Sequence, residues 1–92
     1  MLSKQNLKNL RKSLFINAED FHFVREDFFL NKKGTFKIKA RIRYRQPLQQ
    51  ALLLFVDKGI FLIFENKQSA ITKGQFAALY NGQELVGSGV IS

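Results

Sequence analysis

Cations occupy every second position of one short segment, KIKARIRYRQP at residues 37–47, and cations at that spacing can bind phosphates. An extended chain sends alternate side chains to opposite faces, with ~6.6–6.8 Å between neighbours on one face. The segment therefore predicts a strand with one apolar and one cationic face. Repulsion among the cations indicates an anionic partner rather than a folding role, although a solvated or edge-guarding charged face is the alternative. The cationic positions are Lys37, Lys39, Arg41, Arg43 and Arg45.

The whole chain is basic as well, with 15 Lys+Arg against 7 Asp+Glu and a net charge of +8 over 92 residues. This length predicts a single small domain, and this charge is typical of proteins that bind nucleic acid. An anionic membrane surface is the rival partner, but no apolar run is long enough to span a bilayer. The basic first segment lacks the apolar core of a secretory signal, so we expect a cytoplasmic protein.

The residue types give little support for metal binding or for catalysis by this chain. The chain has no Cys, which excludes disulfides, thiolate metal sites and a Cys nucleophile within it. His22 has no second metal ligand at a usable spacing, so we expect no metal. No acidic pair is suited to acid–base catalysis, and the acidic residues between 19 and 27 are interpreted as solvated turn residues. An exposed Phe could stack on a base, but the sequence does not identify which of the ten Phe that is.

Short strands and frequent turns predict the elements that position these residues. Strands are expected at 21–25, 35–45, 51–57, 59–65, 75–80 and 84–86, with a further short one at the carboxy end. Turns are expected at 17–20, 31–34, 57–59, 66–68 and 81–82. Ser3, Leu7, Leu10 and Leu14 favour a short amino-terminal helix that runs into a strand near residues 14–16. The predicted fold is all-β, a small closed antiparallel β-barrel, since closure removes exposed edges.

Four motifs follow one another along the chain: DFHFV at 20–24, RYRQ at 43–46, AITKGQ at 70–75 and LYNGQELVGSGVI at 79–91. In this order they resemble the carboxy-terminal domain of bacterial tRNA-specific 2-thiouridylases. The resemblance runs from about Leu10 to the end. It implies a β-barrel akin to those of translation factors, placed at the end of a longer enzyme. The family's ATP-pyrophosphatase domain, with its Gly-rich loop and two reactive cysteines, has no counterpart in these residues.

The resemblance also implies that Arg43, Tyr44 and Gln75 contact tRNA. Two positions depart from the family pattern. Lys73 stands where Pro is usual, which puts the geometry at Gln75 in doubt, and Gly87-Ser88-Gly89 stands where three glycines are usual. Strict alternation would turn Tyr44 toward the core, so a buried Tyr remains the alternative there. A plain turn residue is the alternative at Gln75.

We therefore expect residues 1–92 to be one tRNA-docking domain of a tRNA-specific 2-thiouridylase, an enzyme that uses ATP to thiolate the wobble uridine of tRNA. The expected partners are tRNA and the enzyme's other domains. No catalysis and no cofactor are expected in this chain alone, with ATP used by the absent catalytic domain. The alternatives are a structural module that packs between domains, or a free-standing basic RNA-binding barrel. A supporting basic face is expected from Lys37, Lys39, Arg41, Arg45 and Lys73.

Overall fold

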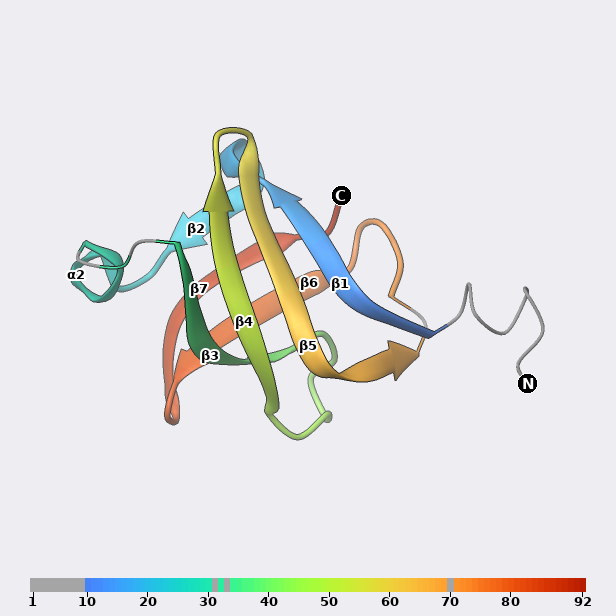
Figure 1. Ribbon diagram of the computed structural model, residues 1–92. Helices are drawn as coiled ribbons and strands as arrows, with labels where there is room; N and C mark the ends of the chain where they lie inside the picture. The colour runs from blue at the N-terminus through green and yellow to red at the C-terminus, as the bar shows by residue number, and fades with distance from the viewer. Residues whose placement is uncertain (1–9, 31, 33, 70) are drawn as a thin grey trace.

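The computed structural model describes residues 10–30, 32, 34–69 and 71–92, with residues 10, 11 and 69 described by their backbone alone. The described residues form seven strands, a 3-10 turn and one short helix (Figure 1). The elements are β1 (Leu10–Asn17), η1 (Ala18–Asp20), β2 (Phe21–Phe23), α2 (Glu26–Phe29), β3 (Thr35–Arg41), β4 (Gln49–Val56), β5 (Gly59–Ser69), β6 (Phe76–Asn81) and β7 (Glu84–Val90).

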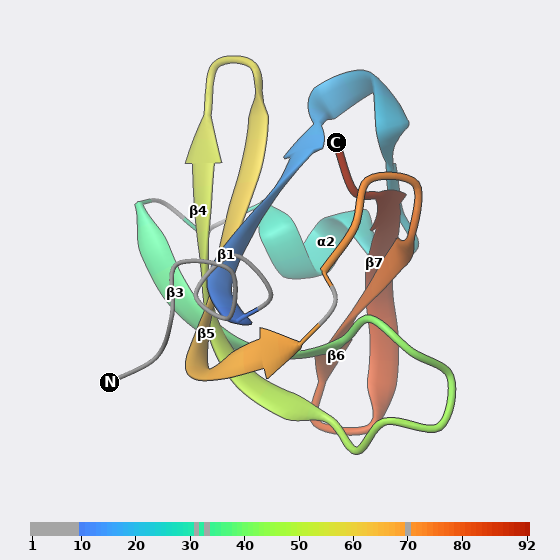
Figure 2. The same cartoon turned by 90° about the vertical axis from the view of Figure 1, so that its right-hand side faces the viewer.

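All strands belong to one curled antiparallel sheet, in the order β1-β5-β4-β3-β6-β7-β2. Figure 2 shows the curl, with β1, β4 and β5 on one side and β6 and β7 on the other. The Ser92 N–H donates to the Phe15 carbonyl oxygen at 2.9 Å, so the chain end lies against β1. The all-β antiparallel prediction is confirmed. The predicted closure is not, because no ladder among the described residues joins β1 to β2.

The core lies inside the curl and follows the two-residue period of the strands. The side chains of Ile38 and Ala40 on β3 point inward, as do Ala51 and Leu53 on the neighbouring β4. The largest fully buried side chains come from both sides of the sheet: Ile16, Leu53, Leu62, Phe64, Leu79 and Val86. Burying such side chains is the main favourable term in folding a domain of this size.

Two glycines of β7 make room for side chains of β2 and β1. A Cβ on Gly87 would lie 2.5 Å from the Phe21 ring, and a Cβ on Gly89 would lie 2.7 Å from the Ile16 side chain. Phe21 pairs with Gly89 across the ladder and is buried. The Gly-Ser-Gly segment is thus a packing feature of the sheet.

The polypeptide between β2 and β3 forms α2, which the sequence did not predict. Phe29 of α2 is buried, and its ring centroid lies 5.1 Å from that of Phe23 and 5.9 Å from that of Phe55. Phe28 and Phe36 pack against this group. Aromatic contacts, rather than helix length, therefore hold this segment against the sheet.

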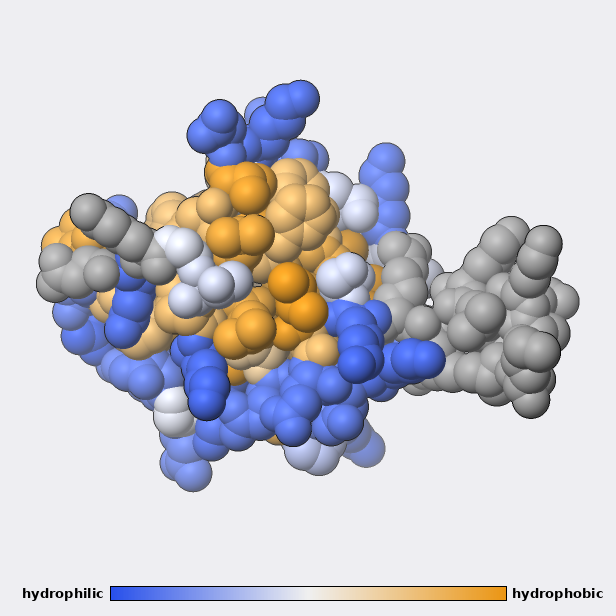
Figure 3. Space-filling view, in the orientation of Figure 1, coloured by the Kyte–Doolittle hydropathy of each residue, from blue (hydrophilic) through white to orange (hydrophobic). Residues whose placement is uncertain are grey.

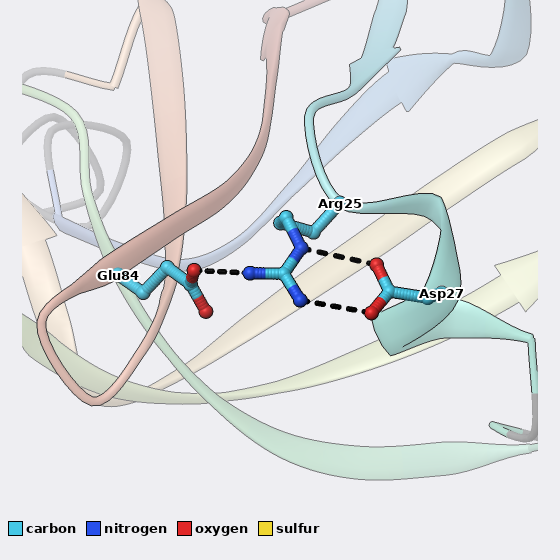
Figure 4. A network of polar contacts seen from close by, with 3 residues as sticks. All are labelled: Arg25, Asp27 and Glu84. Atoms are coloured by element: carbon cyan, nitrogen blue, oxygen red, sulfur yellow. Dashed lines mark hydrogen bonds and ion pairs between the residues drawn. The ribbon is translucent and has the colours of Figure 1, made fainter.

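Arg25 connects this region to the β6–β7 turn (Figure 4). Its guanidinium donates twice to the Asp27 carboxylate, at 3.0 and 2.8 Å, and also donates to Glu84. The hydrogen bonds and the charge of Arg25 lower the pKa of Asp27, and Asp27 in turn raises the pKa of Arg25. This three-residue network ties the start of α2 to the start of β7.

Several predicted boundaries were wrong. The strand expected to reach residue 45 ends at Arg41, and the turn expected at 66–68 is part of β5. β2 ends at Phe23, and the two strands expected after residue 84 are the single strand β7. Leu10 begins β1, so the helix predicted across this segment is absent from residue 10 onward, and its earlier part lies outside the described residues, as do positions 31 and 33 of a predicted turn.

Candidate nucleic-acid interface

Three of the predicted cations lie side by side on the outer face of β3. Lys37 is exposed, while Lys39 and Arg41 are half-buried, and the intervening Ile38 and Ala40 are buried. The prediction of one cationic and one apolar face is therefore confirmed as far as Arg41. We call Lys37, Lys39 and Arg41 the cationic stripe.

β6 borders this stripe, and its Tyr80 lies opposite Lys39 in the ladder, while Ala78 lies opposite Arg41. The Arg41 guanidinium donates a hydrogen bond from Nη2 to the Tyr80 hydroxyl oxygen at 2.9 Å. The guanidinium carbon also lies 5.2 Å from the Tyr80 ring centroid and 5.7 Å from that of Tyr44. Such cation–π contacts hold the guanidinium close to both rings. Arg41 therefore links β3, β6 and the segment that follows β3.

Tyr44 is 85% exposed, so the alternative of a buried Tyr is wrong. The strand ends before Tyr44, and strict alternation no longer determines where its side chain points. An aromatic ring this exposed, next to a guanidinium, offers a flat surface on which a base can stack.

Gln46 shapes the bend at residues 42–46. Its side-chain oxygen accepts a hydrogen bond from the Ile42 N–H at 3.0 Å, and its backbone N–H donates to the Arg43 carbonyl oxygen at 3.1 Å. Its amide nitrogen donates to Gln68, a buried residue of β5 that in turn donates to the Asn66 carbonyl oxygen. Within this bend Arg43 is half-buried and Arg45 exposed, and neither continues the face of β3.

Gln75 lies in a separate turn that precedes β6. Its side-chain oxygen accepts from the Thr72 N–H at 2.9 Å, and its backbone N–H donates to the Thr72 carbonyl oxygen at 3.3 Å. The Gln75 side chain therefore stabilises the turn, and its amide nitrogen has no partner among the described residues. Lys73 is exposed in the same turn, and Gly74 adopts a φ of 94°, a conformation that glycine favours.

Sequence reasoning missed Phe76, which follows Gln75 and is 66% exposed. Ala77 and Leu79 are buried, so the same alternation places Phe76, Ala78 and Tyr80 on the outer face of β6. The sequence of β6 does alternate with a two-residue period. Which of the two alternating sets of side chains points inward became clear only from the pairing of β6 with β3. The outer face of β3 and β6 thus combines cations with exposed aromatic rings.

Within the described part of the chain, no carboxylate pairs with the cations of the stripe. Among the described residues, Lys37, Lys39 and Arg41 have no carboxylate partner, and the ion pairs found involve Arg25. Such a face can neutralise phosphates, and its aromatic rings can stack on unpaired bases.

Neither a cluster of metal ligands nor a helix suited to cross a membrane occurs in the described part of the chain. No three His, Cys, Asp or Glu side chains gather there as metal ligands would. No helix within it has the length and apolar character needed to cross a membrane.

Comparison with known proteins gives a consistent result. The aminomethyltransferase beta-barrel domain family matches residues 13–91. The chain is 50% identical over 82 residues to the tRNA-specific 2-thiouridylase MnmA of Christiangramia forsetii and 51% identical over 82 residues to that of Flavobacterium johnsoniae. Each alignment covers 89% of this chain and 21% of the relative. The chain therefore spans about a fifth of the length of these relatives.

Proposed function

This chain belongs to the aminomethyltransferase beta-barrel domain family, in the branch found at the carboxy end of tRNA-specific 2-thiouridylases, and from that premise we propose that it docks tRNA. Its role is positioning. The cationic stripe, Arg43, Arg45 and Lys73 hold phosphates, and Tyr44 and Gln75 add stacking and polar contacts.

One observation carries this proposal more than any other. The cationic stripe on β3 lies beside exposed or half-exposed aromatic side chains, with the Arg41 guanidinium close to the rings of both Tyr44 and Tyr80. Cations together with stacking rings suit single-stranded or looped RNA, whose bases are accessible and whose backbone is anionic.

The proposal extends to the protein of which this domain is a part. We assign the ATP-dependent 2-thiolation of the wobble uridine to domains outside these 92 residues, and we expect this chain to require no cofactor and to perform no chemistry itself. The parent enzyme would work in the cytoplasm, where its tRNA substrate is found.

The salt dependence of tRNA binding tests the proposal. Each phosphate contact adds about 0.9 to the magnitude of the log–log salt slope on duplex-like nucleic acid. We expect Lys37→Ala and Arg43→Ala each to reduce that magnitude by about one and to weaken binding at every salt concentration. Fluorescence anisotropy with labelled tRNA at low ionic strength measures both quantities.

Lys58→Ala is the matched control, since Lys58 is an exposed lysine in the β4–β5 turn, away from the stripe (Figure 1). It should leave the slope closer to the wild-type value than Lys37→Ala does. Equal effects of Lys37→Ala and Lys58→Ala would mean that the domain attracts tRNA only through its net charge. Unchanged binding in all variants would favour the structural-module alternative.

A further inference from the structure

Next to the cationic stripe the outer surface of the sheet is apolar. Apolar side chains gather there over β4, β5 and β1 (Figure 3). The ladders arrange them in rows. Phe61 lies opposite Phe15 on one side and Leu54 on the other, and Ile63 lies opposite Leu52. We call this set the apolar face: Phe15, Leu52, Leu54, Val56, Phe61 and Ile63.

These side chains point away from the core. On β4 the buried Ala51 and Leu53 alternate with Leu52 and Leu54, and Leu52 is 40% exposed. On β5 the buried Leu62 separates Phe61, which is 39% exposed, from Ile63. An antiparallel sheet that faces water on one side normally carries polar residues there. Apolar residues on both faces indicate that both faces are covered.

Polar residues surround the apolar face. Ser13 and Lys37 end the row that contains Ile63 and Leu52, and Thr35 ends the row that contains Leu54. The hollows at its two ends are lined by apolar residues of the face together with polar neighbours. Lys37, Gln50 and Glu65 join Leu52 and Ile63 at one end, and Asp57 and Lys58 join Phe15, Val56 and Phe61 at the other. An apolar centre with a polar rim is the arrangement of a protein–protein interface, and contiguous exposed apolar patches mark such sites.

We propose that the apolar face docks against the remaining part of the 2-thiouridylase to which this domain belongs. This inference rests on that part of the proposed function which makes the chain one domain of a longer enzyme, and not on tRNA binding. The relatives are much longer than their matched region, so partner surface exists within the same polypeptide. A second copy of this chain is a poorer occupant, since it would bring two cationic stripes and two charges of +8 together.

This chain has no cysteine of its own, so a single introduced thiol marks one position on it and allows a direct test. Leu52→Cys and Leu85→Cys each introduce one thiol at a leucine of similar exposure, 40% on the apolar face and 37% on β7. Each variant is prepared as the isolated chain and as a chimera in which this chain replaces the matching region of the Christiangramia forsetii enzyme. Alkylation rates are read at the labelled peptide by mass spectrometry, without RNA.

We expect the thiol introduced by Leu52→Cys to react at least about tenfold more slowly in the chimera than in the isolated chain, because docking removes it from water. The thiol introduced by Leu85→Cys should react at similar rates in both. Equal rates for Leu52→Cys in both settings would overturn the proposal. Protection in the isolated chain that grows with its concentration would also overturn it, in favour of self-association.

A second measurement keeps the test decisive if a thiol variant misfolds. Leu52→Gln should lower the thermal midpoint of the chimera more than that of the isolated chain, since a partly exposed leucine becomes an interface residue only in the chimera. Leu85→Gln should change both midpoints alike. An equal effect of Leu52→Gln in both settings contradicts docking at this face, whatever the outcome of the tRNA salt titration.

Discussion

At the scale of single residues, Arg41 and Gln46 organise the candidate interface, and the sequence predicted neither role in full. The alternation of cations and apolar residues correctly placed Lys37, Lys39 and Arg41 on one face. It failed from Arg43 onward, because the Gln46 side chain hydrogen-bonds Ile42 and is itself held by Gln68. Such a partner 22 residues away leaves no mark in a local pattern.

Phe76 provides a prediction at this scale. If its exposed ring stacks on a base, Phe76→Ala should weaken tRNA binding by about 1–3 kcal/mol without changing the salt slope, since no charge is removed. Phe76→Trp should preserve binding. Anisotropy titrations at several salt concentrations separate this effect from that of Arg43→Ala.

Phe61→Ala is the control of matched residue type, as Phe61 is an exposed Phe on the apolar face. Its tRNA affinity should equal that of the wild type. A loss of affinity shared equally by Phe61→Ala and Phe76→Ala would show that neither ring acts by local stacking.

At the scale of elements, the hairpins were predictable because their turns carry local signals. Asp57-Lys58-Gly59 and Asn81-Gly82 each join two strands as expected. The polar residues 66–68 resembled a turn, but they continue β5, where the backbone pairs with β1 and the Gln68 side chain is buried. Tertiary hydrogen bonds overrode the local propensity there.

The packing of β2 on β7 gives a prediction at this scale. Gly87→Ala should destabilise the domain by about 1–3 kcal/mol, because the added methyl group would overlap the buried Phe21 ring. Ser88→Ala, at the half-exposed position between the two glycines, should change stability by about 0.5 kcal/mol or less. Urea unfolding followed by far-UV circular dichroism measures both. Equal stability of the two variants would mean that β2 moves away at little cost.

At the scale of the whole molecule, the fold class followed from turn spacing and apolar content, whereas the arrangement of its surfaces did not. Which strands are neighbours decides that Lys39 faces Tyr80 and that Leu52 faces Ile63, and strand order is a non-local property. The sequence therefore predicted a basic barrel-like domain but could not divide its exterior into a cationic stripe and an apolar face.

The response of the whole domain to acid follows from the Arg25 network. Arg25 lowers the pKa of Asp27 below its ordinary value of 3.8, so the folded state releases the carboxyl proton more readily than the unfolded chain. This stabilisation is fully present at pH values above 3.8. It is lost as the pH falls through the lowered pKa that Asp27 has in the folded state. Asp27→Asn should therefore be slightly less stable than the wild type near neutral pH, and the difference should vanish in strong acid.

Urea unfolding at a series of pH values measures that difference. Asp57→Asn, which removes an exposed carboxylate without an ion pair among the described residues, should lack the pH-dependent difference assigned to Asp27. A difference for Asp27→Asn that persists unchanged into strong acid would contradict the role given to Arg25.

Lys37 and Leu52 are opposite each other in the β3–β4 ladder, and this adjacency has a geometric consequence. One belongs to the cationic stripe and the other to the apolar face, so the two surfaces share a border one residue wide. A domain docked on Leu52 would stand above the sheet along that border. A nucleic acid bound at Lys37 would then lie directly beside that domain. A bound nucleic acid would then lie in a groove, with this sheet as its floor and the neighbouring domain as one side.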